Sequence, residues 1–166
     1  MGVTIKSKSR SIDLGGGGFR RLRTKVAELA APDIFEHYKK LGEGMWYPNR
    51  KAFFKDYDEK IAELDKKYKG KMSDILDFLY ESDCDGIMDV PHCRSIYKVI
   101  KDYDDDILYG YTGRKDCAKF ADFKAIVKDG IDSGNGFTWF LNKKERDDLT
   151  VLKRYLLGAI KPQESP

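Results

Sequence analysis

The sequence predicts an α+β protein that is predominantly helical and folds as a single domain. Many segments place apolar residues three or four positions apart, which is typical of helices with one buried face. Three short segments instead alternate apolar and polar residues or concentrate β-formers, which indicates strands. The 166 residues are enough for one hydrophobic core. We expect a compact domain over residues 1–160 and a frayed tail over 161–166.

The strand signals predict one small sheet. Val3 and Ile5 alternate with polar neighbours, as do Ile12 and Leu14, and the polar residues between them suit a hairpin turn. The run 137–141, centred on Trp139, is the strongest strand candidate because large β-forming side chains occupy both of its faces. A further segment, 108–111, is ambiguous between strand and loop.

About seven helices are expected around this sheet. Prolines suit the first turns of helices and glycines suit the residues just after their ends. The apolar stripes that predict the helices are Phe19–Leu22–Val26–Leu29, the segment 32–41, Tyr57–Ile61–Leu64–Tyr68, Met72–Ile75–Leu76–Leu79, Ile96–Val99–Ile100–Tyr103, Phe120–Phe123–Val127–Ile131 and Leu149–Leu152–Leu156–Ile160.

Composition excludes several classes of protein. The charged fraction of 36% is high, but positive and negative residues nearly balance, unlike in a disordered chain. No apolar run approaches the roughly 18 residues of a membrane helix. The N-terminus lacks the apolar core of a signal peptide, and Lys6 does not fit the myristoylation pattern. We therefore expect a cytoplasmic protein with no membrane partner.

Charge is distributed unevenly along the chain. Residues 1–25 carry a local net charge of +6, whereas residues 74–106 carry −7. Basic clusters favour phosphates and nucleic acid, and acidic clusters favour metals or basic partners. The alternative is that both clusters are solvated faces with no binding role.

Three cysteines, Cys84, Cys93 and Cys117, have no repeated spacing. An odd count of this kind indicates free thiols in a reducing compartment. A zinc site made from these thiols and His92 is disfavoured, because the spacing does not match the paired C-x2-C arrangement of structural zinc sites.

The glycine run from Gly15 to Gly18 is the most suggestive motif. A strand, several glycines and a helix that opens with Arg20 and Arg21 together present backbone N–H groups to a phosphate. It is neither a nucleoside-triphosphate loop, since no Lys-Ser/Thr follows, nor the dinucleotide fingerprint, since Arg20 replaces the third glycine. The alternative is a flexible turn. The candidate ligand-binding residues are Gly15, Gly16, Gly17, Gly18, Arg20, Arg21 and Arg23.

The acidic segment 81–89 is the second candidate. Its acids fit the early positions of a calcium-binding EF-hand loop, but His92 stands where a bidentate Glu should close the coordination shell. Asp83, Asp85 and Asp89 are therefore only weak metal ligands. The favoured alternative is a helix-capping turn in which these carboxylates accept hydrogen bonds from nearby backbone N–H groups.

Catalysis finds little support in the sequence. His37 and His92 are the only histidines, and no motif of a hydrolase, metalloprotease or dithiol redox enzyme occurs. An enzyme that uses carboxylates alone leaves no local signature. We expect no cofactor and favour a non-enzymatic role.

Several motifs resemble those of a family of small accessory proteins of bacteria and their phages. They are Ser11-Ile12-Asp13-Leu14-Gly15, Gly17-Gly18-Phe19-Arg20-Arg21-Leu22-Arg23, Phe78-Leu79-Tyr80 with Ser82-Asp83-Cys84-Asp85-Gly86, and Asp102-Tyr103 with Tyr109-Gly110-Tyr111. The resemblance covers about two thirds of the chain and implies a mobile-element protein, with counter-defence as a role. It implies no particular fold or reaction.

The leading hypothesis is a non-enzymatic module that binds a phosphate-bearing small ligand, such as a nucleotide signal, at the glycine turn. A second hypothesis is an inhibitor of a host protein that acts through a charged face. A third is a carboxylate-dependent metalloenzyme centred on Asp83 and Asp85. Direct nucleic-acid binding is the least favoured. Self-association is compatible with a small domain that has a charged end, although no heptad seam argues for it.

Overall fold

The computed structural model describes residues 2–110 and 118–141 of the chain. These residues form six α-helices, one 3₁₀ helix and four strands, which confirms the α+β class. The elements are β1 (Gly2–Lys6), β2 (Ser11–Gly15), α1 (Gly16–Ala30), α2 (Pro32–Lys39), η1 (Lys40–Trp46), α3 (Arg50–Lys67), α4 (Ser73–Tyr80), β3 (Asp85–Met88), α5 (Val90–Ile100), α6 (Phe120–Ser133) and β4 (Phe137–Leu141). The helix expected over 149–160 and the tail 161–166 lie outside the described residues.

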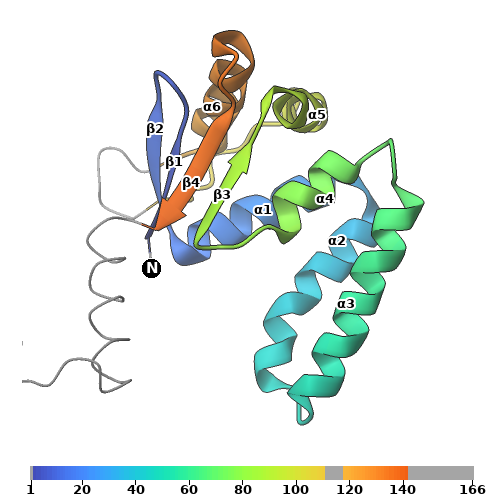
Figure 1. The fold of residues 1–166 in the computed structure, drawn as a ribbon. Coiled ribbons are helices and arrows are strands. Elements are labelled where there is room, and N and C mark those ends of the chain that lie inside the picture. Colours follow the sequence, from blue (N-terminus) through green and yellow to red (C-terminus); the bar gives the residue numbers. More distant parts are fainter. Residues whose placement is uncertain (1, 111–117, 142–166) are drawn as a thin grey trace, which may run out of the picture.

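The four strands form one antiparallel sheet in the order β2-β1-β4-β3 (Figure 1). Ile5 of β1 lies opposite Ile12 on one side and Trp139 on the other. The N-terminal hairpin and its pairing with the segment near Trp139 are therefore as expected. Residues 108–110, the described part of the ambiguous segment, belong to neither a helix nor a strand.

Strand β3 lies within the segment 81–89, for which the sequence predicts a capping turn and no strand. Asp85 lies opposite Phe140, and Met88 lies opposite Phe137. The physical reason is a close contact across the sheet, since a Cβ on Gly86 would lie 2.0 Å from the indole of Trp139. Only glycine leaves room for that ring, and this contact between distant parts of the chain has no local sequence pattern.

The glycine run is also not the loop that the sequence predicts. Gly15 ends β2, and Gly16 is the first residue of α1, so the strand passes directly into the helix. Among the described residues, positive φ angles occur only at Gly70, Gly134 and Gly136. At Gly18 glycine is needed for packing, because a Cβ there would lie 1.6 Å from the carbonyl oxygen of Tyr109.

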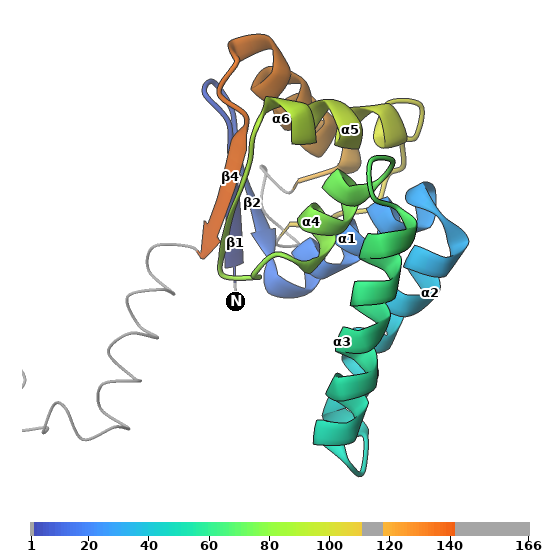
Figure 2. The same cartoon turned by 45° about the vertical axis from the view of Figure 1, so that its right-hand side comes forward.

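The helices α1, α4, α5 and α6 lie on one side of the sheet (Figure 2). The aromatic centre of the core lies between these layers. The ring of Phe78 in α4 packs 5.6 Å from Trp139 and 5.6 Å from Phe123 of α6, measured between centroids. One continuous cluster of buried residues connects sheet and helices, as expected for a single domain.

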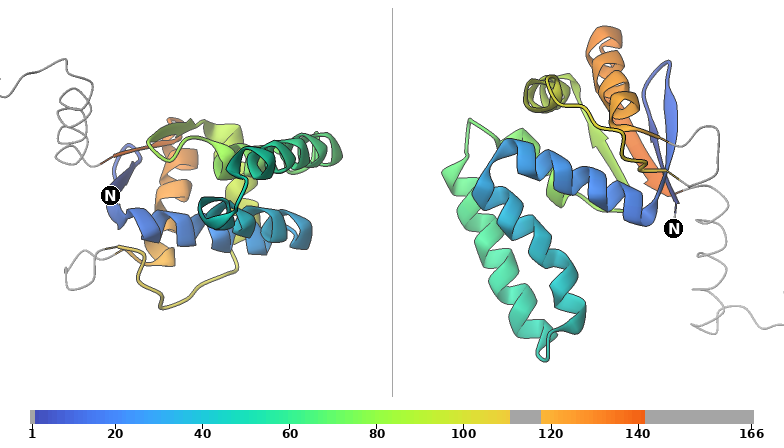
Figure 3. Two further views of the ribbon diagram at one scale, coloured as in Figure 1. Left: turned by 90° about the horizontal axis from the view of Figure 1, so that it is seen from below. Right: turned by 180° about the vertical axis from the view of Figure 1, so that it is seen from behind.

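Helices α2 and α3 form a hairpin that extends away from the sheet (Figures 1 and 3). In α3, which has 18 residues, Tyr57 and Leu64 are the buried ones. The hairpin is therefore attached to the core mainly through α2, whose Ile34 and Tyr38 are buried in the core cluster, whereas α3 buries few side chains. In the part of the chain that the structure describes, no helix is both long and apolar enough to cross a membrane.

Candidate functional site

The three arginines of the predicted anion site point in three directions. Arg20 lies beside Gly42 of η1. A Cβ added to Gly42 would lie 2.4 Å from Nη2 of Arg20. Arg21 donates from Nη2 to the carbonyl oxygen of Leu108 at 2.9 Å. Arg23 enters the core and is only 1% exposed. Arg21 lies on a different side of α1 from Arg23. Arg20 and Arg23 are three positions apart on neighbouring parts of the helix surface, but Arg20 is exposed and Arg23 is buried.

Arg23 is a buried cation with its own partners. Its Nη1 donates to Oδ1 of Asp83 at 2.7 Å and its Nη2 to the carbonyl oxygen of Ser82 at 3.3 Å. The guanidinium carbon lies 4.2 Å from the ring centroid of Phe19 and 5.0 Å from that of Trp139. Burial lowers the pKa of Arg23, and Asp83 partly offsets this effect. Arg23 therefore connects α1 to the segment before β3.

The first turn of α1 is the part of the predicted site that remains open. Gly15 stands at the N-cap and has no side chain that could cap the helix, and no acidic residue lies in the first turn. Gly17 is exposed, with nothing within 4 Å of where its Cβ would stand. The carbonyl of Tyr109 covers Gly18. The first turn is thus uncovered on the side of Gly17.

The three weak metal candidates do not form a common site among the described residues. Asp83 pairs with Arg23, and Asp85 begins β3 with an exposed side chain. Asp89 is the N-cap of α5 and accepts a hydrogen bond from the backbone N–H of His92 at 3.1 Å. The capping interpretation is confirmed for Asp89 alone.

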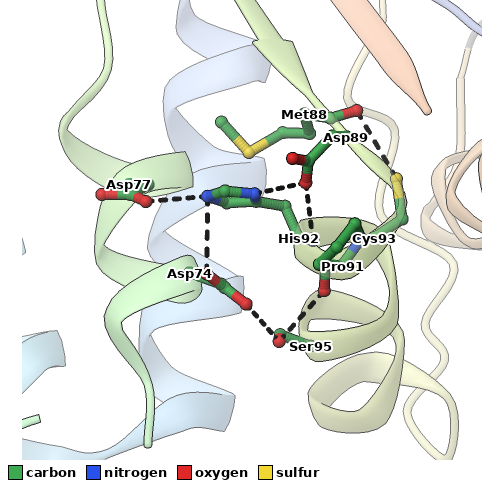
Figure 4. A network of polar contacts seen from close by, with 8 residues as sticks. All are labelled: Asp74, Asp77, Met88, Asp89, Pro91, His92, Cys93 and Ser95. Carbon is green, nitrogen blue, oxygen red and sulfur yellow. Dashed lines mark hydrogen bonds and ion pairs between the residues drawn. The ribbon is translucent and has the colours of Figure 1, made fainter. Parts of the chain in front are cut away.

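A different cluster of polar side chains connects α4 to α5 (Figure 4). The Nδ1 atom of His92 lies 2.6 Å from Oδ1 of Asp89. The Nε2 atom lies 2.8 Å from Oδ2 of Asp77 and 3.4 Å from Oδ1 of Asp74. Asp74 and Asp77, three residues apart on α4, share the face toward His92. Ligand atoms of Asp74, Asp77 and His92 all lie within 4.8 Å of one another, so these residues could hold a metal ion.

Electrostatics and hydrogen bonding stabilise a positive charge in this cluster. Burial lowers the pKa of His92, but hydrogen bonds to Asp77 and Asp89 outweigh it and raise the pKa overall. The same contact with His92 lowers the pKa of Asp89. Ser95 donates from Oγ to Oδ2 of Asp74 at 2.6 Å, which holds that carboxylate in place.

A groove of about 910 Å³ lies between α2, η1 and α3. Its wall on the α3 side is aromatic, because the rings of Tyr47 and Phe53 lie 5.2 Å apart and those of Phe53 and Tyr57 lie 6.0 Å apart. Its rim carries six charged residues, Asp33, Glu36, Lys40, Glu43, Asp56 and Lys60. Among the described residues, Asp33 pairs with Lys67, whereas no ion pair within 4.0 Å involves Glu43, Asp56 or Lys40, so two of these three rim charges are acidic.

His37 also lines this groove and is held in one neutral form. Its Nε2 lies 3.0 Å from the backbone carbonyl oxygen of Tyr57, so Nε2 carries the hydrogen. Its Nδ1 then accepts a hydrogen bond from the hydroxyl of Tyr80 at 2.6 Å. Burial lowers the pKa of His37, which favours this neutral form. The buried hydroxyl of Tyr57 has no partner among the described residues.

Two large aromatic side chains are exposed at the end of the hairpin. Trp46, the last residue of η1, is 88% exposed, and Tyr47 is 52% exposed. Tyr47 also lines the groove, and Trp46 precedes it directly in the chain. We call Trp46, Tyr47 and the groove the hairpin surface.

The thiols agree with the sequence prediction where they are described. Cys84 is exposed and Cys93 is buried, and both are free. Burial raises the pKa of Cys93 to about 12, so it is unreactive at neutral pH. Cys117 lies outside the described residues.

Comparison of the chain with protein-family models, curated proteins and solved structures finds no match. Its function must therefore be inferred from its own residues and geometry.

Sequence reasoning missed both the His92 cluster and the hairpin surface. Asp74 and Asp77 have the i,i+3 spacing of a shared helix face, but their pairing with His92 requires knowing that α4 packs on α5. A usable signal existed for the hairpin surface. The run Met45-Trp46-Tyr47, between Gly44 and Pro48, places large apolar residues where a polar loop is expected.

Proposed function

We propose that the protein is a non-enzymatic interaction protein that binds a partner protein through its hairpin surface. The observation that carries this proposal is the exposure of Trp46, 88%, on a hairpin that extends from the core. Tryptophan and tyrosine supply much of the binding energy at protein interfaces. Exposed apolar surface gathered in one region marks an interaction site, whereas single scattered apolar residues are normal.

The groove indicates the chemistry of the partner. Its volume falls within the range of sites that enclose a ligand or an inserted side chain. Glu43 and Asp56 on the rim favour a basic side chain on the partner, because complementary charge adds specificity. The partner surface would thus combine an apolar socket for Trp46 with a neighbouring Lys or Arg. The resemblance to accessory proteins of bacteria and phages makes a host protein the expected partner, with counter-defence as the context.

The test is affinity capture from bacterial lysate, followed by binding measurements on the purified pair. Trp46→Ala should raise Kd at least about tenfold, because truncation of such a residue typically costs more than about 1.4 kcal/mol. Ile87→Ala is the matched control, since Ile87 is 68% exposed but lies on β3. A partner that binds all three proteins equally would exclude the hairpin surface as the interface.

A second candidate is the binding of a phosphate-bearing small ligand at the first turn of α1. The first turn has no side-chain cap and is open at Gly17, which favours it, and Arg20 and Arg21 follow one turn later in the sequence. Phosphate or a nucleotide should then raise the melting temperature by mass action. The double variant Arg20→Ala, Arg21→Ala should lose this gain, while Arg94→Ala on α5 should keep it. Equal stabilisation of all three proteins would contradict a site at α1.

A further inference from the structure

We propose that Asp74, Asp77 and His92 form a binding site for a first-row divalent transition metal, for which zinc is the best fit. The site lies between α4 and α5 and is independent of the hairpin surface (Figure 4). It also differs from the acidic segment in which the sequence analysis placed its metal candidates.

The cluster needs a positive species at its centre. With its Nδ1–H directed at Asp89, a neutral His92 presents the lone pair of Nε2 to two carboxylates. Three hydrogen-bond acceptors then converge on one point. A proton on Nε2 can serve Asp77 at 2.8 Å, but at 3.4 Å it makes only a weak contact with Oδ1 of Asp74. A metal ion at the centre would bind all three groups at once.

The distances suit a small tetrahedral ion. Zinc bonds to nitrogen and oxygen of about 2.0–2.2 Å place neighbouring ligand atoms roughly 3.3–3.5 Å apart. The separation between His92 Nε2 and Asp74 Oδ1, 3.4 Å, already matches. Asp77 must withdraw by about 0.5 Å to reach that ligand spacing, and its side chain is 54% exposed and free to do so.

The neighbouring side chains orient the ligands as metal sites require. Asp89 accepts from the Nδ1 side of His92, so Nε2 is the nitrogen left for the metal. Ser95 holds Oδ2 of Asp74 at 2.6 Å, which leaves Oδ1 directed at the centre. One imidazole and two carboxylates suit zinc, manganese or cobalt, whereas calcium prefers six to eight oxygen ligands.

The experiment is a calorimetric titration of the metal-free full chain with zinc chloride, with cobalt absorption as a second readout. We expect one zinc ion per chain. Asp77→Asn should weaken binding at least about tenfold, as should His92→Gln, because each removes a ligand. Ser95→Ala should weaken it by about tenfold through loss of orientation. The exposure of Asp77 makes Asp77→Asn the variant least prone to unfolding, and thermal melts establish that it is folded.

Two variants serve as matched controls. Asp85→Asn removes a nearby exposed carboxylate outside the cluster, and Cys84→Ser removes an exposed thiol that could bind zinc by itself. Both should retain wild-type affinity. The proposal is overturned if the wild type binds no zinc at millimolar concentration, if Asp77→Asn and His92→Gln bind as well as wild type, or if calcium is preferred. His92 would then be a protonated bridge between α4 and α5.

Discussion

Arg23 shows most directly that the role of a residue in the fold can differ from the role that its neighbours in the sequence suggest. In the sequence it belongs to a basic cluster that suggests a bound phosphate, whereas in the fold its guanidinium is buried against Asp83 and three aromatic rings. No local pattern distinguishes a buried arginine from a solvated one, because the distinction depends on which distant residues cover it. Asp83 was likewise predictable as an acid in a turn but not as the partner of Arg23.

The ion pair between Arg23 and Asp83 leads to a prediction on stability. Asp83→Asn should destabilise the fold by about 1–2 kcal/mol, since it leaves a buried guanidinium without its counter-charge. The cost is at the low end for such a pair because the side chain of Asp83 is 76% exposed and water screens the charge. Asp85→Asn, an exposed neighbour, should change stability by less than about 0.5 kcal/mol. Urea unfolding of both variants measures the difference, and equal values would contradict the structural role of Asp83.

His37 predicts a pH dependence with a definite sign. Burial lowers the pKa of His37 in the folded state, so the unfolded chain takes up a proton at a higher pH than the folded chain. Its contribution to stability is complete above the unfolded pKa of about 6.5 and is lost as the pH falls below that value. Protonation would also remove the acceptor for the Tyr80 hydroxyl.

The measurement for His37 is urea unfolding at pH 7.5 and pH 5.5. His37→Gln should reduce the loss of stability on acidification relative to wild type. His92→Gln is an informative control, because the raised pKa of His92 stabilises the fold at low pH and its removal should increase the loss. An unchanged pH dependence in His37→Gln would show that the imidazole is not held neutral.

Secondary structure with strong local patterning was predictable at the scale of elements. The helices α1, α3 and α6 have apolar stripes, and β4 has the same bounds as the predicted strand 137–141. Strand β3 was not predictable, since only Met88 of its four residues is buried and Gly86 is required by the ring of Trp139. The glycine run was misjudged for a related reason, because glycines at a helix start serve close packing as well as flexibility.

Neighbouring glycines at the start of α1 should therefore respond oppositely to alanine. Gly17→Ala should stabilise the protein by about 0.4–1 kcal/mol, because the added methyl meets open space and the unfolded chain loses freedom. Gly18→Ala should destabilise it by about 1–3 kcal/mol, because the methyl collides with the backbone of Tyr109. Thermal melts of the two variants make the comparison. Destabilisation by both would mean that the first turn needs glycine for its conformation.

The charge asymmetry of the sequence is partly cancelled in the whole molecule. The basic helix α1 contacts the acidic segments, since Arg23 pairs with Asp83. Burial raises the pKa of Asp105, but hydrogen bonds from Tyr103, Tyr109 and the backbone of Ile107, together with the charge of Lys25, lower it overall. Part of the basic end and part of the acidic middle therefore neutralise each other in the fold. What distinguishes the surface of the molecule instead is the hairpin of α2 and α3, which no charge pattern predicts.

The attachment of this hairpin to the core predicts a hierarchy of local stability. Regions with few buried apolar contacts open without global unfolding, and α3 buries only Tyr57 and Leu64 among its 18 residues. The segment from η1 into the first half of α3 should therefore exchange its amide hydrogens faster than α6 and β4, which line the aromatic core. Hydrogen exchange followed by mass spectrometry on peptides covering 40–58 and 120–141 measures this difference.

Binding of a partner at the hairpin surface should slow exchange in 40–58 selectively, and Trp46→Ala should abolish that protection while leaving exchange in 120–141 unchanged. Equal protection of the two segments in the free protein would show that the hairpin is an integral part of the cooperative core.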